Sequence, residues 1–121
     1  MYDVACLGIL VTDVVARTVD ELPEKGKLKA IDGISMHIGG CASNACVDLA
    51  KIGLNAVVIG NVGDDSFGEF LINSLKKENV KTDGLKVKPG VNTSSTVVLI
   101  SESGERTFLH CIGSNASLTY D

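Results

Sequence analysis

Apolar positions along the chain fall into two strand-like runs with a helix-like segment between them. Residues 3–11, "DVACLGILV", are almost continuously apolar, which is typical of a strand covered on both faces in a parallel sheet. Residues 56–63, "AVVIGNVG", have the same pattern. Between the two runs, apolar side chains recur at helical spacing, while Ser43, Asp48 and Lys51 face away from them. The apolar stripe consists of Ala42, Ala45, Cys46, Leu49 and Ala50.

A second helix is predicted directly after the second strand. Ser66 is its expected N-cap, with Glu69 completing a capping box. The first helix is expected to end before Gly53, which suits a left-handed C′ position. The apolar face of the second helix consists of Phe67, Phe70, Leu71 and Leu75. Strand, helix, strand and helix at these lengths form a βαβα unit, so the predicted fold class is an α/β sandwich.

Two further segments are β-rich and are expected to form a small lid. Residues 28–38 alternate loosely between polar and apolar side chains, and residues 93–112 contain two β-rich runs around the turn "ESGE", which predicts a hairpin. The hairpin has more apolar side chains than one face can bury: Val97, Val98, Leu99, Ile100, Phe108, Leu109 and Ile112. Residues 28–38 can cover one face at best. The uncovered face predicts a homodimer that pairs two lids.

Composition and charge exclude several classes of protein. With 121 residues, 45% of them hydrophobic and 21% charged, the chain has the balance of one modest globular domain. A net charge of −4, scattered lysines and the lack of tryptophan argue against a nucleic-acid surface. No apolar run reaches the ~20 residues that span a bilayer, and no secretory signal is visible. We therefore expect no membrane association and a cytoplasmic location.

The four cysteines, Cys6, Cys41, Cys46 and Cys111, include no C-x-x-C pair and have no histidine at ligand spacing. Buried free thiols are therefore expected, rather than disulfides or a zinc site. No metal-binding residue is predicted.

The candidate chemistry lies where "HIGGCASNA" leads into the first helix. Gly39 and Gly40 lack side chains, so a ligand can approach the backbone N–H groups at the helix N-terminus closely. Asn44, in the first turn, offers donors and an acceptor, which suits hydroxyl groups better than a phosphate. Asp13 follows the first strand at the same edge of the sheet, and its carboxylate can accept hydrogen bonds from two neighbouring hydroxyls. The structural alternatives are a tight turn with Asn44 as helix cap, and a solvated loop acid at Asp13.

These residues belong to a wider pattern. "LGILVTD", "LPEKGK", "GGCASNA", "VGDDSFGEFL" and "GERTFLHCIGSNASLT" together resemble the N-terminal portion of ribokinase-like carbohydrate kinases of the phosphofructokinase B type. The resemblance implies a ribokinase-like three-layer α/β sandwich, with a β-lid at residues 28–38 and 93–112 that often pairs with another subunit. It implies ATP- and Mg²⁺-dependent phosphorylation of a sugar hydroxyl. The sugar pocket that it implies is lined by Asp13, Gly39, Gly40 and Asn44.

Departures from the family pattern limit what the resemblance implies. Val11 and Cys41 stand where ribokinases carry Asn and Lys, so ribose is not singled out as the substrate. The family's Gly-Ala-Gly-Asp segment, which supplies the catalytic base and the anion hole, does not occur in the sequence. Thr119 is placed to cap a further helix, which the chain does not continue. We therefore expect residues 1–121 to be the N-terminal part of a single kinase domain, inactive alone and without a tightly bound cofactor, because the C-terminal ATP-binding and catalytic half is absent.

Two other functions stay open from the sequence. A nucleoside kinase of the adenosine type would keep the fold, but base stacking would need aromatic groups from the lid, where Phe108 is the only ring. A non-catalytic sugar-binding or dimerisation module would use the lid strands as an interface. The general base is expected outside these residues, so no catalytic residue is assigned.

Overall fold

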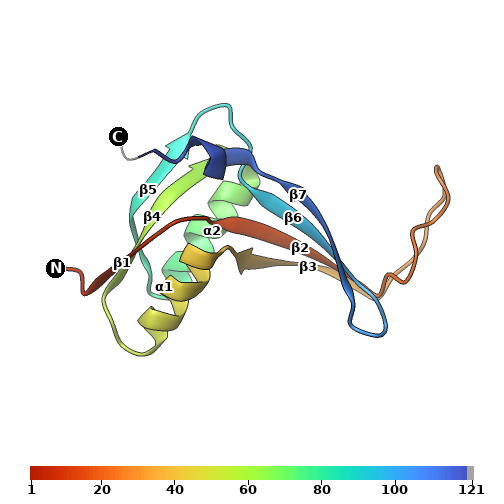
Figure 1. Ribbon diagram of the computed structural model, residues 1–121, viewed down its shortest axis with the longest axis horizontal. Helices are drawn as coiled ribbons and strands as arrows, with labels where there is room; N and C mark the ends of the chain where they lie inside the picture. Colours follow the sequence, from red (N-terminus) through yellow and green to blue (C-terminus); the bar gives the residue numbers. More distant parts are fainter. Residues whose placement is uncertain (120–121) are drawn as a thin grey trace.

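The computed structural model describes residues 1–119, which form two sheets and two α-helices (Figure 1). In chain order the elements are β1 (Val4–Leu7), β2 (Val11–Arg17), β3 (Gly33–Gly39), α1 (Cys41–Lys51), β4 (Ala56–Gly63), α2 (Ser66–Lys77), β5 (Lys81–Lys88), β6 (Ser95–Ile100), β7 (Arg106–Cys111) and the 3-10 helix η1 (Gly113–Ser117). The helix predicted to follow Thr119 lies outside the described residues. No helix among residues 1–119 is both long and apolar enough to cross a membrane.

The first sheet is parallel, in the order β1-β4-β5, and both α-helices pack on one of its faces. The core between the sheet and the helices consists of Leu10, Ala42, Cys46, Ala56, Val58, Val62, Leu71, Leu75 and Val80. On the opposite face, Leu7 and Ile59 are 68% and 36% exposed. The α/β fold class is confirmed, and residues 1–119 contain the sheet and one helical layer of the sandwich.

The second sheet is the lid, which extends away from the helices in the order β3-β2-β6-β7 (Figure 1). β2 pairs antiparallel with β3 and parallel with β6, and β6 and β7 form an antiparallel hairpin, as predicted. The expectation that residues 28–38 cover a face of the hairpin is wrong. β3 is hydrogen-bonded to β2 within the same sheet, so it covers neither face. Residues 20–30 are all exposed and project beyond the lid as an arm.

The first apolar run is two strands and not one, contrary to the prediction. Gly8, with φ +155°, lies between β1 in the first sheet and β2 in the lid. Because apolar residues continue through the break, the hydrophobic pattern does not reveal it. β5 is also missed by the pattern, because "KTDGLKVK" forms an edge strand with mostly polar or exposed side chains.

Helix α1 lies where predicted, but its buried stripe is rotated. Ser43 is fully buried and Ala45 is exposed, the reverse of the expected pattern. The reason is that α1 packs against β1 and β3 as well as β4, so the stripe runs through Ala42, Ser43 and Cys46. Gly53 follows the helix with φ +97°, as predicted for its left-handed position.

Helix α2 also lies where predicted, but its cap is one residue earlier. Asp65, and not Ser66, is the N-cap: its Oδ1 accepts a hydrogen bond from Gly68 N–H at 3.0 Å. The expected capping box is therefore wrong. Asp65 takes this role because its backbone is extended, with φ −119° and ψ 177°, while Ser66 is already helical.

All four cysteines are free thiols, as expected, but only Cys46 is fully buried. Burial in the core, with the Cys6 side chain hydrogen-bonded beside it, raises the pKa of Cys46 to about 12. Cys41 and Cys111 are exposed, contrary to the expectation of buried thiols. The reason is that Cys41 is the first residue of α1 and Cys111 the last residue of an edge strand.

The segment η1 fastens the two sheets together through Asn115. The Asn115 side chain accepts a hydrogen bond from Leu10 N–H at 3.2 Å and donates one to Leu10 C=O at 3.0 Å, as a neighbouring strand would. Its backbone N–H donates to Ser94 Oγ at 2.9 Å. Leu10 is fully buried where the chain passes from the first sheet to the lid, so Asn115 satisfies the backbone groups of that crossing.

Replacing Asn115 by Ala should lower the free energy of unfolding by about 2–4 kcal/mol, because two buried backbone groups of Leu10 lose their partners. Ala116→Ser, at an exposed neighbour in η1, should change it by less than about 0.5 kcal/mol. Urea unfolding followed by circular dichroism measures both values. Equal stability of the two variants would contradict the role assigned to Asn115.

Candidate functional site

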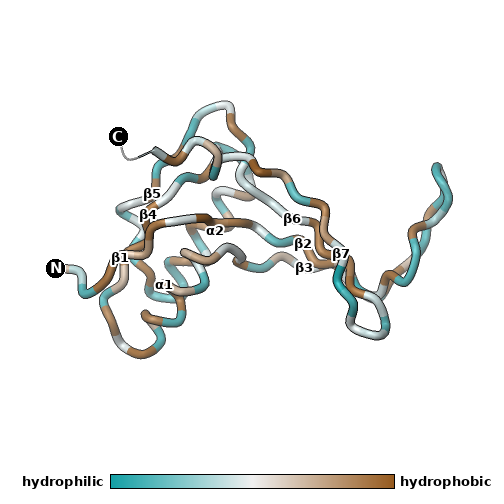
Figure 2. The backbone as a smooth tube through the Cα atoms, viewed as in Figure 1, coloured by the Kyte–Doolittle hydropathy of each residue, from teal (hydrophilic) through white to brown (hydrophobic). Residues whose placement is uncertain are grey.

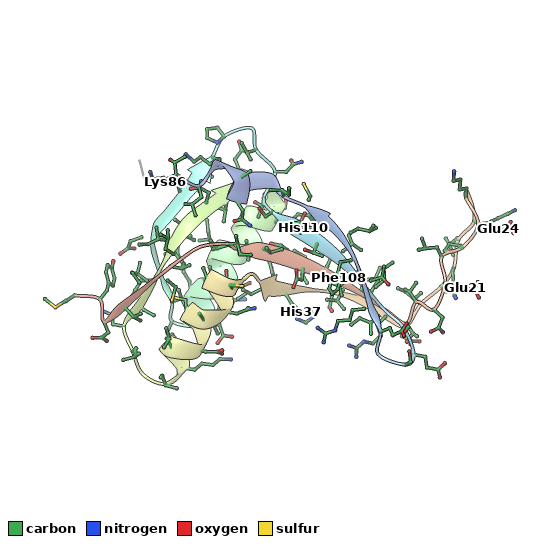
Figure 3. All side chains as sticks on the ribbon, in the orientation of Figure 1. Glu21, Glu24, His37, Lys86, Phe108 and His110 are labelled. Carbon is green, nitrogen blue, oxygen red and sulfur yellow. The ribbon has the colours of Figure 1, made fainter. Side chains whose placement is uncertain are left out.

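The register of the lid places four polar side chains in one row across its strands. Asp13 on β2 lies opposite His37 on β3 and beside Thr96 on β6. Thr96 in turn lies opposite His110 on β7. Residues paired in register project from the same face of a sheet, so Asp13, His37, Thr96 and His110 share one face, called here the polar face of the lid. Figure 3 labels the two histidines, which come from the two edge strands.

Asp13 lies against the turn that starts α1. A side chain at Gly39 would place its Cβ 2.5 Å from Asp13 Oδ2, so the carboxylate occupies the space that the glycine leaves. Gly40 is the N-cap of α1, with φ +92°, and a Cβ there would lie 2.5 Å from the carbonyl oxygen of Ile9. The structure thus brings Asp13, Gly39 and Gly40 together, while their role in binding stays a prediction.

Asp13 lies in a different secondary-structure element from the one expected. It is the third residue of β2, within the lid, and not a loop acid after the first strand. The break at Gly8 is the reason, because it moves residues 11–17 into the second sheet. The solvated-loop alternative is therefore wrong, and Asp13 is half-buried.

Asn44 lies on the exposed side of the first turns of α1. Its backbone N–H donates to Gly40 C=O at 3.0 Å, an ordinary helical bond. Gly40 holds the N-cap position and no side chain caps α1, so the alternative that makes Asn44 the helix cap is wrong. Of the two positions that depart from the family pattern, Val11 is buried opposite Gly39, and Cys41 is exposed beside the turn.

The two histidines act on the ionisation of Asp13. Burial raises the pKa of Asp13 above its ordinary value, and the charges of His37 and His110 offset part of this effect. Each imidazole contacts a hydroxyl: Thr96 Oγ1 lies 2.8 Å from His110 Nδ1. Ser35 Oγ lies 2.8 Å from His37 Nε2. The row therefore combines a half-buried acceptor with two oriented imidazoles.

Sequence patterns alone do not single out His37, Thr96 or His110. Their common row depends on how β2 pairs with β3 and β6, and β2 is hidden in an apolar run that continues from β1. The signal that could have found them is the polar pair Thr12 and Asp13, which interrupts the apolar run after "LGILV" and marks the start of a second strand. Within the lid, His37 lies on the strand next to Asp13 and His110 lies two strands away, on the opposite edge.

The segment "GDDSFG", which leads from β4 into α2, has a structural role. The second carboxylate oxygen of Asp65 accepts a hydrogen bond from Thr93 N–H at 2.9 Å, and Thr93 Oγ1 accepts one from Gly63 N–H at 2.8 Å. Burial acts to raise the pKa of Asp65, but the hydrogen bonds from Thr93 and Gly68 outweigh it and hold the pKa below its ordinary value. These hydrogen bonds tie β4 and α2 to the segment that leads into β6.

A cavity of about 540 Å³ lies on the face of the first sheet opposite α1 and α2. Its lining includes Leu7, Ile59, Lys86 and Lys88, and none of the predicted site residues (Lys86 is labelled in Figure 3). Across residues 1–119, no group of three or more His, Cys, Asp or Glu side chains could hold a metal ion. The predicted site residues therefore lie outside this cavity, at the polar face of the lid and at the start of α1 beside it.

The fold, a parallel α/β sheet with a β-rich lid, is that of the ribokinase-like class of proteins. The structure of fructokinase from Halothermothrix orenii superposes with a TM-score of 0.81 at 27% identity, over 98% of this chain and 41% of its own. The structure of Arabidopsis thaliana ribokinase complexed with ribose and ATP gives a TM-score of 0.84 at 20% identity, over 94% and 37%. The second likeness shows the fold alone.

The chain belongs to the pfkB family of carbohydrate kinases, whose family model matches residues 1–121. Ribokinase of Schizosaccharomyces pombe is 32% identical over 124 aligned positions, which cover 98% of this chain and 39% of the ribokinase. Fructokinase of Klebsiella pneumoniae is 36% identical over 80 residues, 66% of this chain and 26% of the fructokinase. The chain thus spans less than two fifths of the length of these relatives.

The two glycines should tolerate alanine differently. At Gly40 a Cβ would meet the backbone of Ile9, and the positive φ strains any L-residue, so Gly40→Ala should cost about 2–4 kcal/mol of unfolding free energy. At Gly39 the atoms nearest to the Cβ belong to the Asp13 side chain, which can rotate, so Gly39→Ala should cost about 1 kcal/mol and displace the carboxylate. Urea unfolding measures both costs, and NMR titration of Asp13 reports the displacement. The opposite order of stability would show that this turn is assigned wrongly.

Proposed function

We propose that residues 1–121 form the sugar-binding part of a longer, ATP-dependent carbohydrate kinase that phosphorylates a sugar hydroxyl. The observation that carries the proposal is the Asp13 carboxylate beside the Gly39–Gly40 turn at the N-terminus of α1. Asp13 accepts hydrogen bonds from two neighbouring hydroxyls, and Asn44 supplies further donors and an acceptor. The two glycines let the sugar approach the backbone closely. Membership of the pfkB family supports the reaction class.

ATP and Mg²⁺ would be held mainly by residues outside this chain. The first turn of α1 contains no basic side chain, and residues 1–119 contain no metal-ligand cluster. These residues therefore do not fit a nucleotide phosphate or its metal ion, and the sequence lacks the Gly-Ala-Gly-Asp segment that the resemblance links to catalysis. The contribution of this chain is to position the sugar, which is a large part of catalysis in phosphoryl transfer.

The substrate class that we propose is a monosaccharide with adjacent hydroxyl groups. The ribokinase and fructokinase relatives support this class. A nucleoside is the second candidate, because Phe108 lies on the same lid face as Asp13 and is 58% exposed, where it could stack on a base.

The experiment uses the longer kinase that carries this sequence, assayed with pentoses, hexoses and adenosine. Asp13→Asn and Asn44→Ala should each lower kcat/KM for the sugar by about tenfold or more, because each removes a hydrogen bond worth roughly 1–3 kcal/mol. The KM for ATP should stay unchanged. Glu102→Gln, in the exposed hairpin turn, is the control and should leave both parameters unchanged. The isolated chain should form no ADP.

The pH dependence of sugar binding gives a second measurement. Sugar binding needs the ionised carboxylate, and the pKa of Asp13 is raised. Binding should therefore weaken as the pH falls through this raised value, at a higher pH than for an ordinary carboxylate. Asp13→Asn should abolish that dependence. Wild-type sugar kinetics in both site variants, or sugar phosphorylation by the isolated chain, would overturn the proposal.

We also propose that two copies pair through the opposite face of the lid. Residues in register form two rows on that face, called here the apolar face: Met36, Val14, Val97 and Leu109, then Ile34, Ala16, Leu99 and Thr107. Ile34 and Leu109 are 69% and 61% exposed. Figure 2 shows hydrophobic stretches along β2 and β7 of the lid. An identical copy related by a two-fold axis would cover this surface.

Leu109→Asp should shift the assembly toward monomer without unfolding it, because Leu109 is exposed on the apolar face. Val98→Asp should instead unfold the lid, because Val98 lies on the other face and is only 6% exposed. Sedimentation velocity at micromolar concentrations gives the mass, and circular dichroism reports folding. A concentration-independent monomer for the unmodified protein would contradict the pairing.

A further inference from the structure

On the polar face of the lid, polar side chains lie next to one another across β2, β6 and β7 in the row beside the Gly39–Gly40 turn. In the next row outward on the same face, Val15 and Val98 lie beside each other, with Phe108 opposite Val98. In the inner row, Thr96 and His110 continue outward from Asp13 across β6 and β7. The inner row is thus polar across β2, β6 and β7, whereas the next row is apolar on these three strands, with Ser35 of β3 beside Val15 and with Arg17 and Arg106 one row farther out.

Thr96 determines how the His110 ring is presented. Thr96 is 9% exposed, and its Oγ1 lies 2.8 Å from His110 Nδ1. The ring nitrogen nearer the backbone is therefore occupied, while the outer nitrogen, Nε2, makes none of the hydrogen bonds found within residues 1–119. His110 is exposed, so this outer nitrogen can meet a ligand.

The other histidine of the row has the opposite arrangement. The outer nitrogen of His37, Nε2, lies 2.8 Å from Ser35 Oγ on the same strand. Of the two imidazoles on either side of Asp13, only His110 has its inner nitrogen occupied and its outer nitrogen available. Both edge strands carry a histidine (Figure 3), but only β7 presents an outer imidazole nitrogen that a ligand can reach.

The distance between Asp13 and His110 suits a small sugar. They lie two strands apart, and neighbouring strands are about 4.8 Å apart, so their backbones are separated by about 10 Å. Thr96, between them, is short, nearly buried and already in contact with His110. A monosaccharide that lies along the row can contact the carboxylate at one end and the imidazole at the other.

We propose that His110 is a specificity-determining residue: its Nε2 hydrogen-bonds one oxygen of the sugar, separate from the hydroxyl pair on Asp13, and Thr96 positions the ring. The inference rests on the proposed sugar-binding function and adds a second point of recognition to it. The preferred substrate then carries a hydroxyl or carbonyl oxygen several bonds away from the pair that Asp13 binds.

The test is a cycle of protein and substrate changes in the longer kinase that carries this sequence. Wild type is first assayed with ribose, fructose and glucose, and then with the monodeoxy analogues of the sugar that it phosphorylates best. His110→Ala should lower kcat/KM for that sugar by about tenfold. For the one analogue that lacks the oxygen bound by His110, the variant should cause no further loss. The matched control, Arg106→Gln, lies farther out on the same strand and should change nothing.

Two further variants separate recognition from structure. His110→Gln, which retains a donor near the position of Nε2, should recover part of the lost kcat/KM. Thr96→Val keeps the shape of the side chain but removes its hydroxyl, so it should weaken the selectivity and change the tautomer of His110 seen by ¹⁵N NMR. An unchanged tautomer in Thr96→Val would overturn the positioning role.

The outcomes distinguish the inference from the function on which it rests. Equal losses in His110→Ala for every analogue, or no loss for any, would overturn the inference while the sugar kinase function stands. Failure of the wild-type kinase to phosphorylate any of the pentoses and hexoses in the assay of the proposed function would overturn that function, and the inference with it.

Discussion

The backbone of Ile9 and Leu10, where the chain passes from the first sheet into the lid, is the constraint on which the candidate site depends. Ile9 C=O accepts a hydrogen bond from Ala42 N–H at 3.2 Å, and Leu10 pairs with the side chain of Asn115. Buried backbone groups cannot remain unpaired at low cost, so both the start of α1 and the segment η1 are held against this crossing. The same crowding excludes a side chain at Gly40, whose Cβ would strike the Ile9 carbonyl.

The crossing also determines where Asp13 lies and how its ionised carboxylate affects the stability of the fold. Asp13 is three residues beyond Leu10, on the strand that pairs with β3, so its carboxylate lies against Gly39. Its pKa is raised by burial, which means that the folded protein favours the protonated form. Above the raised folded-state pKa, the ionised carboxylate therefore lowers stability in full, and this deficit shrinks as the pH falls from that value toward the unfolded-state pKa, below which it is absent. A group held at such a cost is typical of a binding site.

Local patterns in the sequence are sufficient to predict α1, α2, β4 and the β6–β7 hairpin, because helical periodicity and turn residues depend on near neighbours. They do not reveal that the first apolar run divides at Gly8, since both sides of the break are apolar. The edge strand β5 is missed because its side chains are polar or exposed. The proximity of Asp13 to Gly39 could be expected from the family pattern, although Asp13 lies in a strand and not a loop. The row that adds Thr96 and His110 depends on non-local register, which periodicity does not encode.

The lid is a sheet without a core of its own. Its two faces are linked because they are the two sides of the same strands. Only its base rests on a helix, where Thr12 Oγ1 donates to Phe67 C=O at 3.0 Å. Farther out, Phe108 on the polar side and Leu109 on the apolar face are 58% and 61% exposed. A small sheet with exposed apolar side chains on both faces becomes more ordered when a ligand or another chain packs against it. A sugar on one face and a second copy on the other would both stabilise the same ordered strands, and each therefore lowers the ordering cost of the other. Binding and pairing through this lid are for that reason expected to be positively coupled.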